Sequence, residues 1–284
     1  MSLKILAISR APKFSPGNVE NDVAILREVA DCLSREGYNL KLISEEEFLK
    51  FPTDCKVIIN MCRGEDSVRK LRQLEKEGCI VINSAQGIEN SRRKNMTRLM
   101  ERATIPSADN ILLSRENLSV IPGDENWSPS VKRLLEKHEI EKCWIKKGDG
   151  YTTDKNDICF CNSPAEVEAA LREMFERGEE GAILSRHIEG DLVKFYGIAG
   201  QPYFHWYYPE GGQNKFDVKE LEATSRMLAK IFGLTIYGGD CIVREDGSYA
   251  VIDFNDWPSF KVCRKEAAHH ITAAIISEIK TRLP

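Results

Sequence analysis

The sequence lacks long apolar runs and an excess of charge of either sign. Its apolar stretches are strand-sized, far below the roughly 18 residues that a membrane span needs. Forty basic residues stand against 44 acidic ones, for a net charge of −4. We therefore expect neither nucleic acid nor a membrane as a partner. Hydrophobic residues make up 42% of the chain and charged residues 30%, which excludes intrinsic disorder.

Paired cysteines are also missing. None of the nine cysteines forms a CxxC pair, whereas a zinc site or a secreted disulfide scaffold needs cysteines at tight spacing. Most lie inside apolar runs such as 79–82 and 240–243, so we expect buried, reduced thiols. Residues 1–14 contain one short apolar run and no small-residue cleavage site. We therefore expect no signal peptide and a cytoplasmic location.

Two common nucleotide-binding motifs do not occur. The chain has no GxxxxGK[ST] segment, which excludes a P-loop protein. No GxGxxG follows the first apolar strand, which disfavours a Rossmann dinucleotide site. A nucleotide site in this chain would have to use other residues.

The first third of the sequence alternates between two patterns. Short apolar segments are followed by segments whose apolar residues recur every three or four positions, as on one face of a helix. Gly37 and Gly78 follow two of the helical segments, where glycine commonly ends a helix. This alternation predicts βαβ units and a parallel sheet. The predicted strands are 5–8, 40–43, 57–59 and 79–82, and the predicted helices are 23–33, 67–77 and 91–102.

The rest of the chain has a mixed α+β pattern. We expect strands, hairpins and helices in both of its halves, without the regular alternation of the first third. The predicted helices here are 131–137, 164–177, 217–232 and 267–282. Three lobes follow from these shifts in pattern: an N-terminal α/β lobe over 1–105, a central α+β lobe over 106–180, and a C-terminal α+β lobe over 181–284.

A hairpin is predicted over residues 238–254. Asp246-Gly247 lies between two apolar runs, which is the strongest short-range hairpin signal. With these two residues at the centre of the turn, Arg244 faces Tyr249 across the ladder.

The same register places Asp240 directly opposite Asp253, and Asn255 points to the same face as Asp253. Opposed carboxylates destabilise a strand pair unless a cation lies between them. Carboxylate and amide oxygens suit Mg²⁺, which takes waters and phosphate oxygens as its other ligands. The alternative is a surface hairpin with solvated acids, but Asp253 lies in the apolar run 251–254. We therefore predict a magnesium site.

Magnesium held by few protein ligands indicates a nucleotide, whose phosphates need cations. Lys146 ends the apolar strand 144–146. An unpaired buried lysine is costly, whereas a phosphate partner stabilises it; the alternative is a paired lysine at a strand end. Lys94 is a second candidate, although its basic run 92–94 could equally be a solvated helix face.

Together these residues resemble the ATP-grasp superfamily, in the branch of carboxylate–amine and carboxylate–thiol ligases that includes glutathione synthetase and D-alanine–D-alanine ligase. Four segments in the family's order carry the resemblance and span nearly the whole chain. They are 81–84 followed by Lys94, the strand 144–146, the inter-lobe hinge 183–190, and Asp240 with 253–258.

The resemblance implies an N-terminal substrate lobe and two α+β lobes that grip ATP, with a lid over residues 148–157. The hinge would read adenine through its main chain. The implied site residues are Lys94 and Lys146 for the phosphates; Arg186, His187, Ile188 and Asp191 for adenine and ribose; Lys194 as the catalytic lysine near the γ-phosphate; and Asp240, Asp253 and Asn255 for one or two Mg²⁺.

The implied reaction transfers the γ-phosphoryl group of ATP to a carboxylate of a small molecule or peptide, and an amine or thiol then attacks the acylphosphate. Gly238 stands where some of these ligases have a catalytic arginine. Two alternatives stay open: a small-molecule kinase, because the Asp253-x-Asn255 motif also resembles inositol phosphate kinases, and an ATP-binding protein without turnover. Lys261, Arg264 and Lys265 either bind an anionic substrate or are solvated. A homodimer is the commonest closed assembly.

Overall fold

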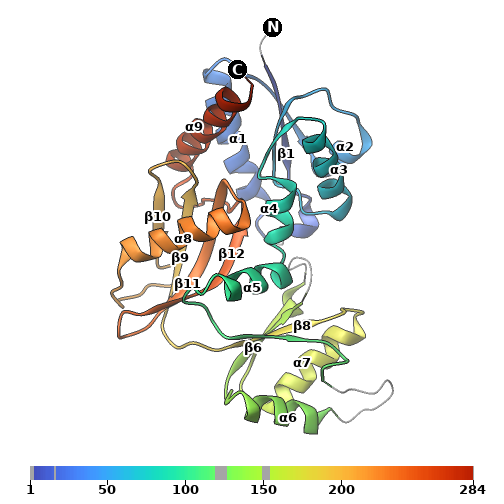
Figure 1. The fold of residues 1–284 in the computed structure, drawn as a ribbon, viewed down its shortest axis with the longest axis vertical. Helices are drawn as coiled ribbons and strands as arrows, with labels where there is room; N and C mark the ends of the chain where they lie inside the picture. Colours follow the sequence, from blue (N-terminus) through green and yellow to red (C-terminus); the bar gives the residue numbers. More distant parts are fainter. Residues whose placement is uncertain (1–2, 16, 119–126, 149–153, 284) are drawn as a thin grey trace.

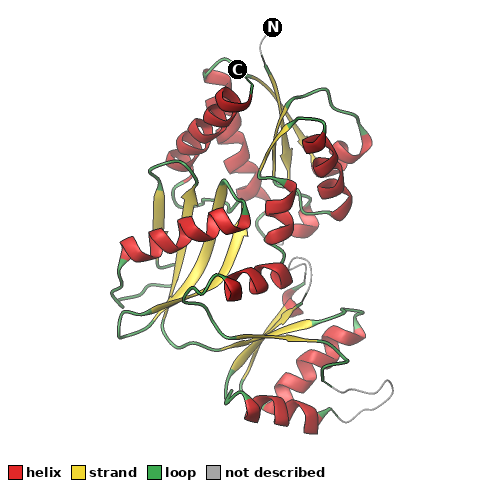
Figure 2. Ribbon diagram, viewed as in Figure 1, coloured by secondary structure: helices red, strands yellow, loops and turns green. Residues whose placement is uncertain are grey.

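The part of the chain that the structure describes forms three four-stranded sheets (Figure 1). A computed structural model describes residues 3–15, 17–118, 127–148 and 154–283. Helices lie against each sheet (Figure 2). Within those ranges, no helix combines the length and apolarity needed to cross a membrane.

The N-terminal sheet is parallel, with the order β2-β1-β3-β4, as the alternating sequence pattern predicts. Its strands are β1 (Lys4–Ser9), β2 (Asn39–Ser44), β3 (Val57–Asn60) and β4 (Ile80–Ile82). The accompanying helices are α1 (Val19–Arg35), α2 (Glu45–Lys50), α3 (Glu65–Lys76), α4 (Ala85–Asn90), α5 (Arg93–Arg102) and the 3₁₀ helix η1 (Pro12–Phe14).

The central sheet is antiparallel, with the order β5-β8-β6-β7. It extends past the predicted boundary at residue 180, because β8 pairs with both β5 and β6. Its elements are β5 (Asn110–Leu113), α6 (Ser128–Lys137), β6 (Cys143–Lys147), the 3₁₀ helix η2 (Lys155–Asp157), β7 (Ile158–Cys161), α7 (Pro164–Glu176) and β8 (Ala182–Arg186). The core of this lobe lies between the sheet and the helices α6 and α7.

The C-terminal sheet is antiparallel, with the order β10-β9-β11-β12. Its elements are β9 (Asp191–Ile198), β10 (Phe204–Tyr207), α8 (Val218–Phe232), β11 (Ile236–Val243) and β12 (Tyr249–Asp256). Helices α5 and α8 cover one face and bury an aromatic and aliphatic core there. The other face carries the pair Lys194 and Asp240, and toward the N-terminal lobe its residues Tyr196, Ile198 and Ile236 are buried in a second core.

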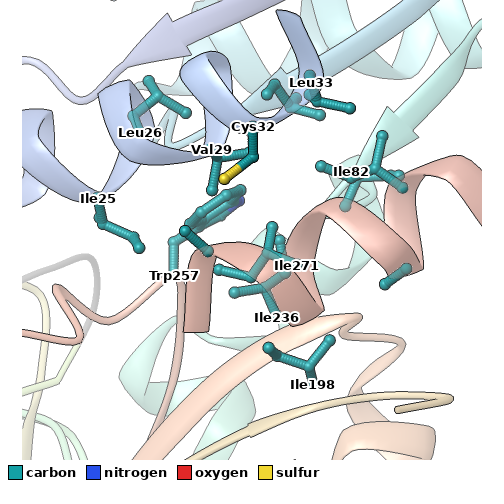
Figure 3. Packing of buried hydrophobic residues seen from close by; sticks show 14 of the residues in the cluster. Ile25, Leu26, Val29, Cys32, Leu33, Ile82, Ile198, Ile236, Trp257 and Ile271 are labelled. Carbon is teal, nitrogen blue, oxygen red and sulfur yellow. The ribbon is translucent and has the colours of Figure 1, made fainter. Parts of the chain in front are cut away.

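The last helix, α9 (Arg264–Arg282), packs against α1 rather than against the C-terminal sheet alone. Its residues share one core with α1 and with the N-terminal sheet. Trp257 lies between the two helices, close to Val29 and Ile271 (Figure 3). The end of the predicted C-terminal lobe therefore completes the N-terminal core, and this packing joins the two lobes. All nine cysteines are free, and seven of them are buried.

Candidate active site

The hairpin of β11 and β12 carries the predicted carboxylate pair. Asp240 pairs directly with Asp253, as predicted. The turn differs from the prediction, because Val243 rather than Arg244 pairs with Tyr249. Near the turn the register is therefore displaced by one residue.

A bulge corrects this displacement. The register shifts between Asp240 and Cys241, whose partners are Asp253 and Val251, so that Ile252 is left unpaired. A bulge inserts one extra residue and re-aims the side chains beyond it. As a result, Val251 and Phe254 both point into the core under α8, while Asp253 points to the opposite face. The longer turn and the bulge cancel, which is why the predicted Asp240–Asp253 pair is correct.

Four polar side chains meet on this open face. Lys194 on β9 pairs with Asp240, and its Nζ donates to Asp240 Oδ1 at 3.0 Å and to Oδ2 at 2.9 Å. The Asn255 amide donates to Asp253 Oδ2. Two carboxylates, an amide and an ammonium thus share one patch of the sheet.

Burial governs the charges of this patch. It raises the pKa of Asp240; the Lys194 charge opposes that rise and the Asp253 charge adds to it. Burial alone would lower the pKa of Lys194, but the charge and hydrogen bonds of Asp240 prevail and raise it. Two acids desolvated side by side favour a cation between them, and the Asn255 oxygen could complete the ligand set. Across the described ranges, no group of three or more His, Cys, Asp or Glu side chains could hold a metal, so a metal here would depend on that amide.

Two further cations face Asp253 from other elements. Lys146 on β6 is half-buried. Burial lowers the pKa of Lys146 to about 8; the charge of Arg93 also lowers this pKa, whereas the charge of Asp253 raises it. Burial also lowers the pKa of Arg93, at the start of α5, while Asp253 and Asp157 oppose the change. Arg93 Nη1 donates to the Lys147 carbonyl at 3.3 Å. The N-terminal and central lobes thus both supply positive charge to the carboxylate pair.

A cavity of about 440 Å³ opens beside the carboxylate pair. One end is lined by Arg93, Lys194, Asp240 and Asp253. The other end lies between the N-terminal lobe and the segment that follows β12. The cavity thus has a strongly charged end, and its whole volume is of small-molecule size.

Comparison with known proteins gives a fold. No protein-family model and no curated protein matches the chain, but solved structures do. The D-alanine–D-alanine ligase from Coxiella burnetii superposes with a TM-score of 0.73 at 13% identity, over 99% of this chain and 97% of that one. The chain has the ATP-grasp fold. A RimK domain ATP-grasp protein from Sphaerobacter thermophilus superposes with a TM-score of 0.71 at 12% sequence identity, over 96% of this chain and 99% of that one. The D-alanine–D-alanine ligase from Bacillus anthracis, complexed with ATP, superposes with a TM-score of 0.71 at 15% sequence identity, over 100% of this chain and 98% of that one.

The central sheet of this ATP-grasp fold presents an aromatic face. Trp144 lies 4.9 Å from Phe160, measured between ring centroids, and its Nε1 donates to His187 Nδ1 at 3.1 Å. Ile158 and Phe160 are 37% and 39% exposed, although large apolar side chains are usually covered. Lys146 lies on the same face, because it alternates with Ile145, which is in the core of the lobe.

The hinge residues divide between this face and the opposite one. The Arg186 side chain points to the helix side, where it donates to the carbonyls of His138 and Glu139 and contacts Asp109. This side chain anchors the end of α6, and the contact of the hinge main chain with adenine stays a prediction. The His187 amide donates to the Lys142 carbonyl.

The other two predicted hinge residues, Ile188 and Asp191, lie near the two ends of the link between β8 and β9. Ile188 lies in the extended link between β8 and β9 and is half-buried. Asp191 Oδ2 accepts hydrogen bonds from the amides of Gln213 and Asn214, both at 2.8 Å, and these bonds lower its pKa. Asp191 therefore holds the loop that precedes α8.

Lys94 does not line the cavity, and its role at the phosphates stays a prediction. It is exposed and borders a separate hollow with Arg98 and Gly148. Its neighbour Arg93 instead lines the cavity and interacts electrostatically with Asp253. A usable signal existed, since Arg93 shares a helix face with the buried residues Met96 and Met100. Of the predicted lid, residues 149–153 lie outside the described residues.

Asn83, from the predicted ATP-grasp entry segment, links two lobes. Its Oδ1 accepts from the amides of Thr235 and Ile236 at 2.8 and 2.9 Å, and its Nδ2 donates to the Ile236 carbonyl at 2.7 Å. Since Asn83 is fully buried, these bonds fix the start of β11 to the end of β4. The strand that carries Asp240 is thus held from the N-terminal lobe.

Proposed function

We propose that this chain is an ATP- and Mg²⁺-dependent, ADP-forming ligase that activates a carboxylate for attack by an amine or thiol. One observation carries the proposal: the Asp240–Asp253 pair of an ATP-grasp fold lies beside a charged cavity, with Lys194, Lys146 and Arg93 facing the pair. Such a cluster suits a triphosphate next to a second, small substrate.

The nucleotide would lie between the central and C-terminal sheets. The exposed aromatic face of Trp144 and Phe160 suits a flat base, with the main chain at Ile188 beside it. Lys146 and Arg93 would take the phosphates, because both are desolvated cations and a phosphate partner offsets that cost.

Magnesium bound by the oxygens of Asp240, Asp253 and Asn255 would neutralise the charge of the transferring phosphoryl group. The protein's own contribution is positioning. Lys194 holds Asp240 and lines the same end of the cavity, so its ammonium lies where negative charge develops on the phosphoryl oxygens. The cavity walls from the N-terminal and C-terminal lobes would exclude water from the acylphosphate.

The proposed reaction has two balanced steps. A carboxylate oxygen attacks the γ-phosphorus, the bond to the β,γ-bridging oxygen breaks, and ADP leaves. The amine or thiol then attacks the acyl carbon and loses a proton, and inorganic phosphate leaves. Two of the similar structures are D-alanine–D-alanine ligases, one of them complexed with ATP, which supports this reaction class.

A kinase on the same fold is less well supported. An inositol polyphosphate acceptor would need several cations for its phosphates. The two arginines at the far end of the cavity are instead paired with acids, Arg10 with Asp22 at 2.9 Å and Arg63 with Asp256 at 2.9 Å. That end of the cavity therefore fits an acceptor with little negative charge better than a polyphosphate.

Hydroxylamine trapping tests the proposal. We expect the protein, given Mg²⁺, ATP and a panel of small carboxylic acids, to form ADP and a hydroxamate, because hydroxylamine captures an acylphosphate. Asp253→Asn should abolish both products. A phosphorylated acceptor without hydroxamate would identify a kinase instead, and ATP binding without ADP from any acid or acceptor would identify a protein without turnover.

A further inference from the structure

A histidine side chain completes the aromatic face of the central sheet. His187 directly follows β8, and its ring meets that of Phe160 edge-on, with the centroids 5.0 Å apart. Its Nδ1 accepts the hydrogen bond from Trp144 Nε1 at 3.1 Å. Trp144 in turn packs on Phe160. The imidazole is therefore the third ring of this face, and it fixes the polar edge of the indole.

The bond from Trp144 determines which nitrogen of His187 carries the proton. An indole nitrogen can only donate, so an Nδ1 that accepts from it is unprotonated. The proton of the neutral ring is then on Nε2, which lies 3.3 Å from Glu189 Oε1 and donates to that carboxylate. The contact with Trp144 thus selects one tautomer of the neutral imidazole.

Two charged side chains lie at the other edge of the imidazole. Glu189 accepts from its Nε2, and Lys142 Nζ donates to the same carboxylate oxygen at 2.9 Å. Hydrogen bonds from Lys142 and His187 lower the pKa of Glu189, so Glu189 is a carboxylate throughout the range in which histidines titrate. Glu189 favours a charged ring and the lysine opposes it. Trp144 excludes a charged ring, because both nitrogens of an imidazolium are donors.

Protonation of His187 is therefore incompatible with its bond to Trp144. Two N–H groups would face each other across the 3.1 Å that separates Nδ1 from the indole nitrogen. His187 is only half-buried, so a proton can reach it from solvent. The bond exists on the alkaline side of the imidazole titration and is lost as pH falls through it, in the range of about pH 8 to 5. The orientation of the indole should change with it.

The main chain of His187 has a separate task. Its amide donates to the Lys142 carbonyl at 3.0 Å, which ties the end of β8 to the start of β6. This bond does not depend on the imidazole, so a change in the side chain leaves the backbone pairing in place.

We infer that His187 is a positioning residue for Trp144, and that protonation of its imidazole releases the indole and weakens binding of a nucleotide base on the aromatic face. His187 acts through Trp144 rather than on the nucleotide. The effect on nucleotide binding rests on the proposed function, whereas the control of Trp144 by His187 does not.

The first measurement follows the contact in the full chain without any ligand. The tryptophans are labelled with ¹⁵N, and the indole N–H signal of Trp144 is assigned with Trp144→Phe. We expect the signal to move between about pH 8 and about pH 5.5 in wild type. It should not move in His187→Asn, whose side-chain oxygen can accept from Trp144 throughout this range. His269→Asn, at an exposed histidine on α9, is the matched control and should behave as wild type.

The second measurement is the Kd of a non-hydrolysable ATP analogue with Mg²⁺. His187→Ala removes the acceptor, so we expect Kd to rise about fivefold at about pH 8, and His187→Asn should restore most of the affinity. Acidification should weaken binding more in wild type than in His187→Asn; the comparison between the two is needed because Lys146 titrates on the same face. In a Trp144→Ala background, His187→Ala should have no further effect, since a residue that acts through another is not additive with it.

Three outcomes would each overturn the inference: a Trp144 signal that does not move with pH in wild type, an equal movement in His187→Asn, or additive losses of affinity for His187→Ala and Trp144→Ala. If the signal moves as expected and no nucleotide binds to wild type, the proposed function fails and the positioning of Trp144 by His187 stands.

Discussion

The central and C-terminal sheets have the same strand number, but the faces opposite their covering helices differ in chemistry. Each has four antiparallel strands with helices on one face. The face of the central sheet opposite α6 and α7 carries Trp144, Ile158 and Phe160. The face of the C-terminal sheet opposite α5 and α8 carries Asp240 and Asp253 with their polar partners.

Because of this difference, we expect the two faces to contribute differently to nucleotide binding. Apolar contact is insensitive to ions, so binding to the central sheet should not depend on Mg²⁺. Opposed carboxylates repel both each other and a triphosphate, so binding to the C-terminal sheet should require a cation. Variants on the two faces should therefore separate into a metal-dependent and a metal-independent class.

The largest effect is expected at Asp253. Replacing it with Ala removes one carboxylate of the pair, and we expect the Mg²⁺-dependent part of nucleotide stabilisation to disappear. At a ligand concentration of about 100 times Kd, that part is worth roughly 2.7 kcal/mol, which thermal unfolding resolves. Glu245→Gln, an exposed acid of the same hairpin, should behave as wild type. A Mg²⁺-dependent shift that survives Asp253→Ala would move the metal elsewhere.

The next effect is expected at Lys194. Lys194→Met removes the ammonium that lies 2.9 Å from Asp240, so we expect turnover in the hydroxamate assay to fall about 10²-fold. Lys194→Arg keeps the charge and should retain much more activity. If both variants lose activity equally while binding nucleotide normally, side-chain shape rather than charge is what matters at this position.

A smaller effect is expected on the aromatic face. Trp144→Ala removes the ring that packs 4.9 Å from Phe160, and base stacking of this kind is worth about 1–3 kcal/mol. We expect nucleotide Kd to rise about tenfold with an unchanged Mg²⁺ requirement. Phe51→Ala, at a ring that is 62% exposed on the N-terminal lobe, is the control. A changed Mg²⁺ requirement in Trp144→Ala would contradict the separation of the two faces.

The sequence predicted what local patterns determine. Helix periodicity located α1, α3, α7, α8 and α9 to within a few residues of their observed bounds. Strand alternation and one turn signal located the Asp240–Asp253 pair. That success involved two opposite deviations, since neither the longer turn nor the bulge at Ile252 was expected.

Features set by distant contacts were not predicted. The pairing of β8 with β5 joins residues about 75 positions apart in sequence, such as Asn110 and Ser185. The roles of Arg10 and Arg63 depend on loops that Glu45 draws together. Arg93 is different, because the helix face shared with Met96 would have favoured it over Lys94.

The smallest expected effect concerns Lys146, on the aromatic face of the central sheet. Burial lowers the pKa of Lys146 from 10.5 to about 8, so between these two pH values the unfolded chain binds more protons than the folded chain. Stability should therefore rise with pH through that window. We expect the stability of wild type relative to Lys146→Met to increase from about pH 8 to about pH 10 in urea titrations.

Lys146→Arg tests the cause of that rise, because arginine stays protonated throughout the window and should show no increase over Lys146→Met. Bound Mg²⁺–ATP should reduce the increase in wild type, since a phosphate beside Lys146 favours its charged form and raises its pKa. An increase of the same size with and without nucleotide would mean that the phosphates lie away from Lys146. The triphosphate would then be bound only by the face of the C-terminal sheet that carries Asp240 and Asp253, and the aromatic face would bind only the base.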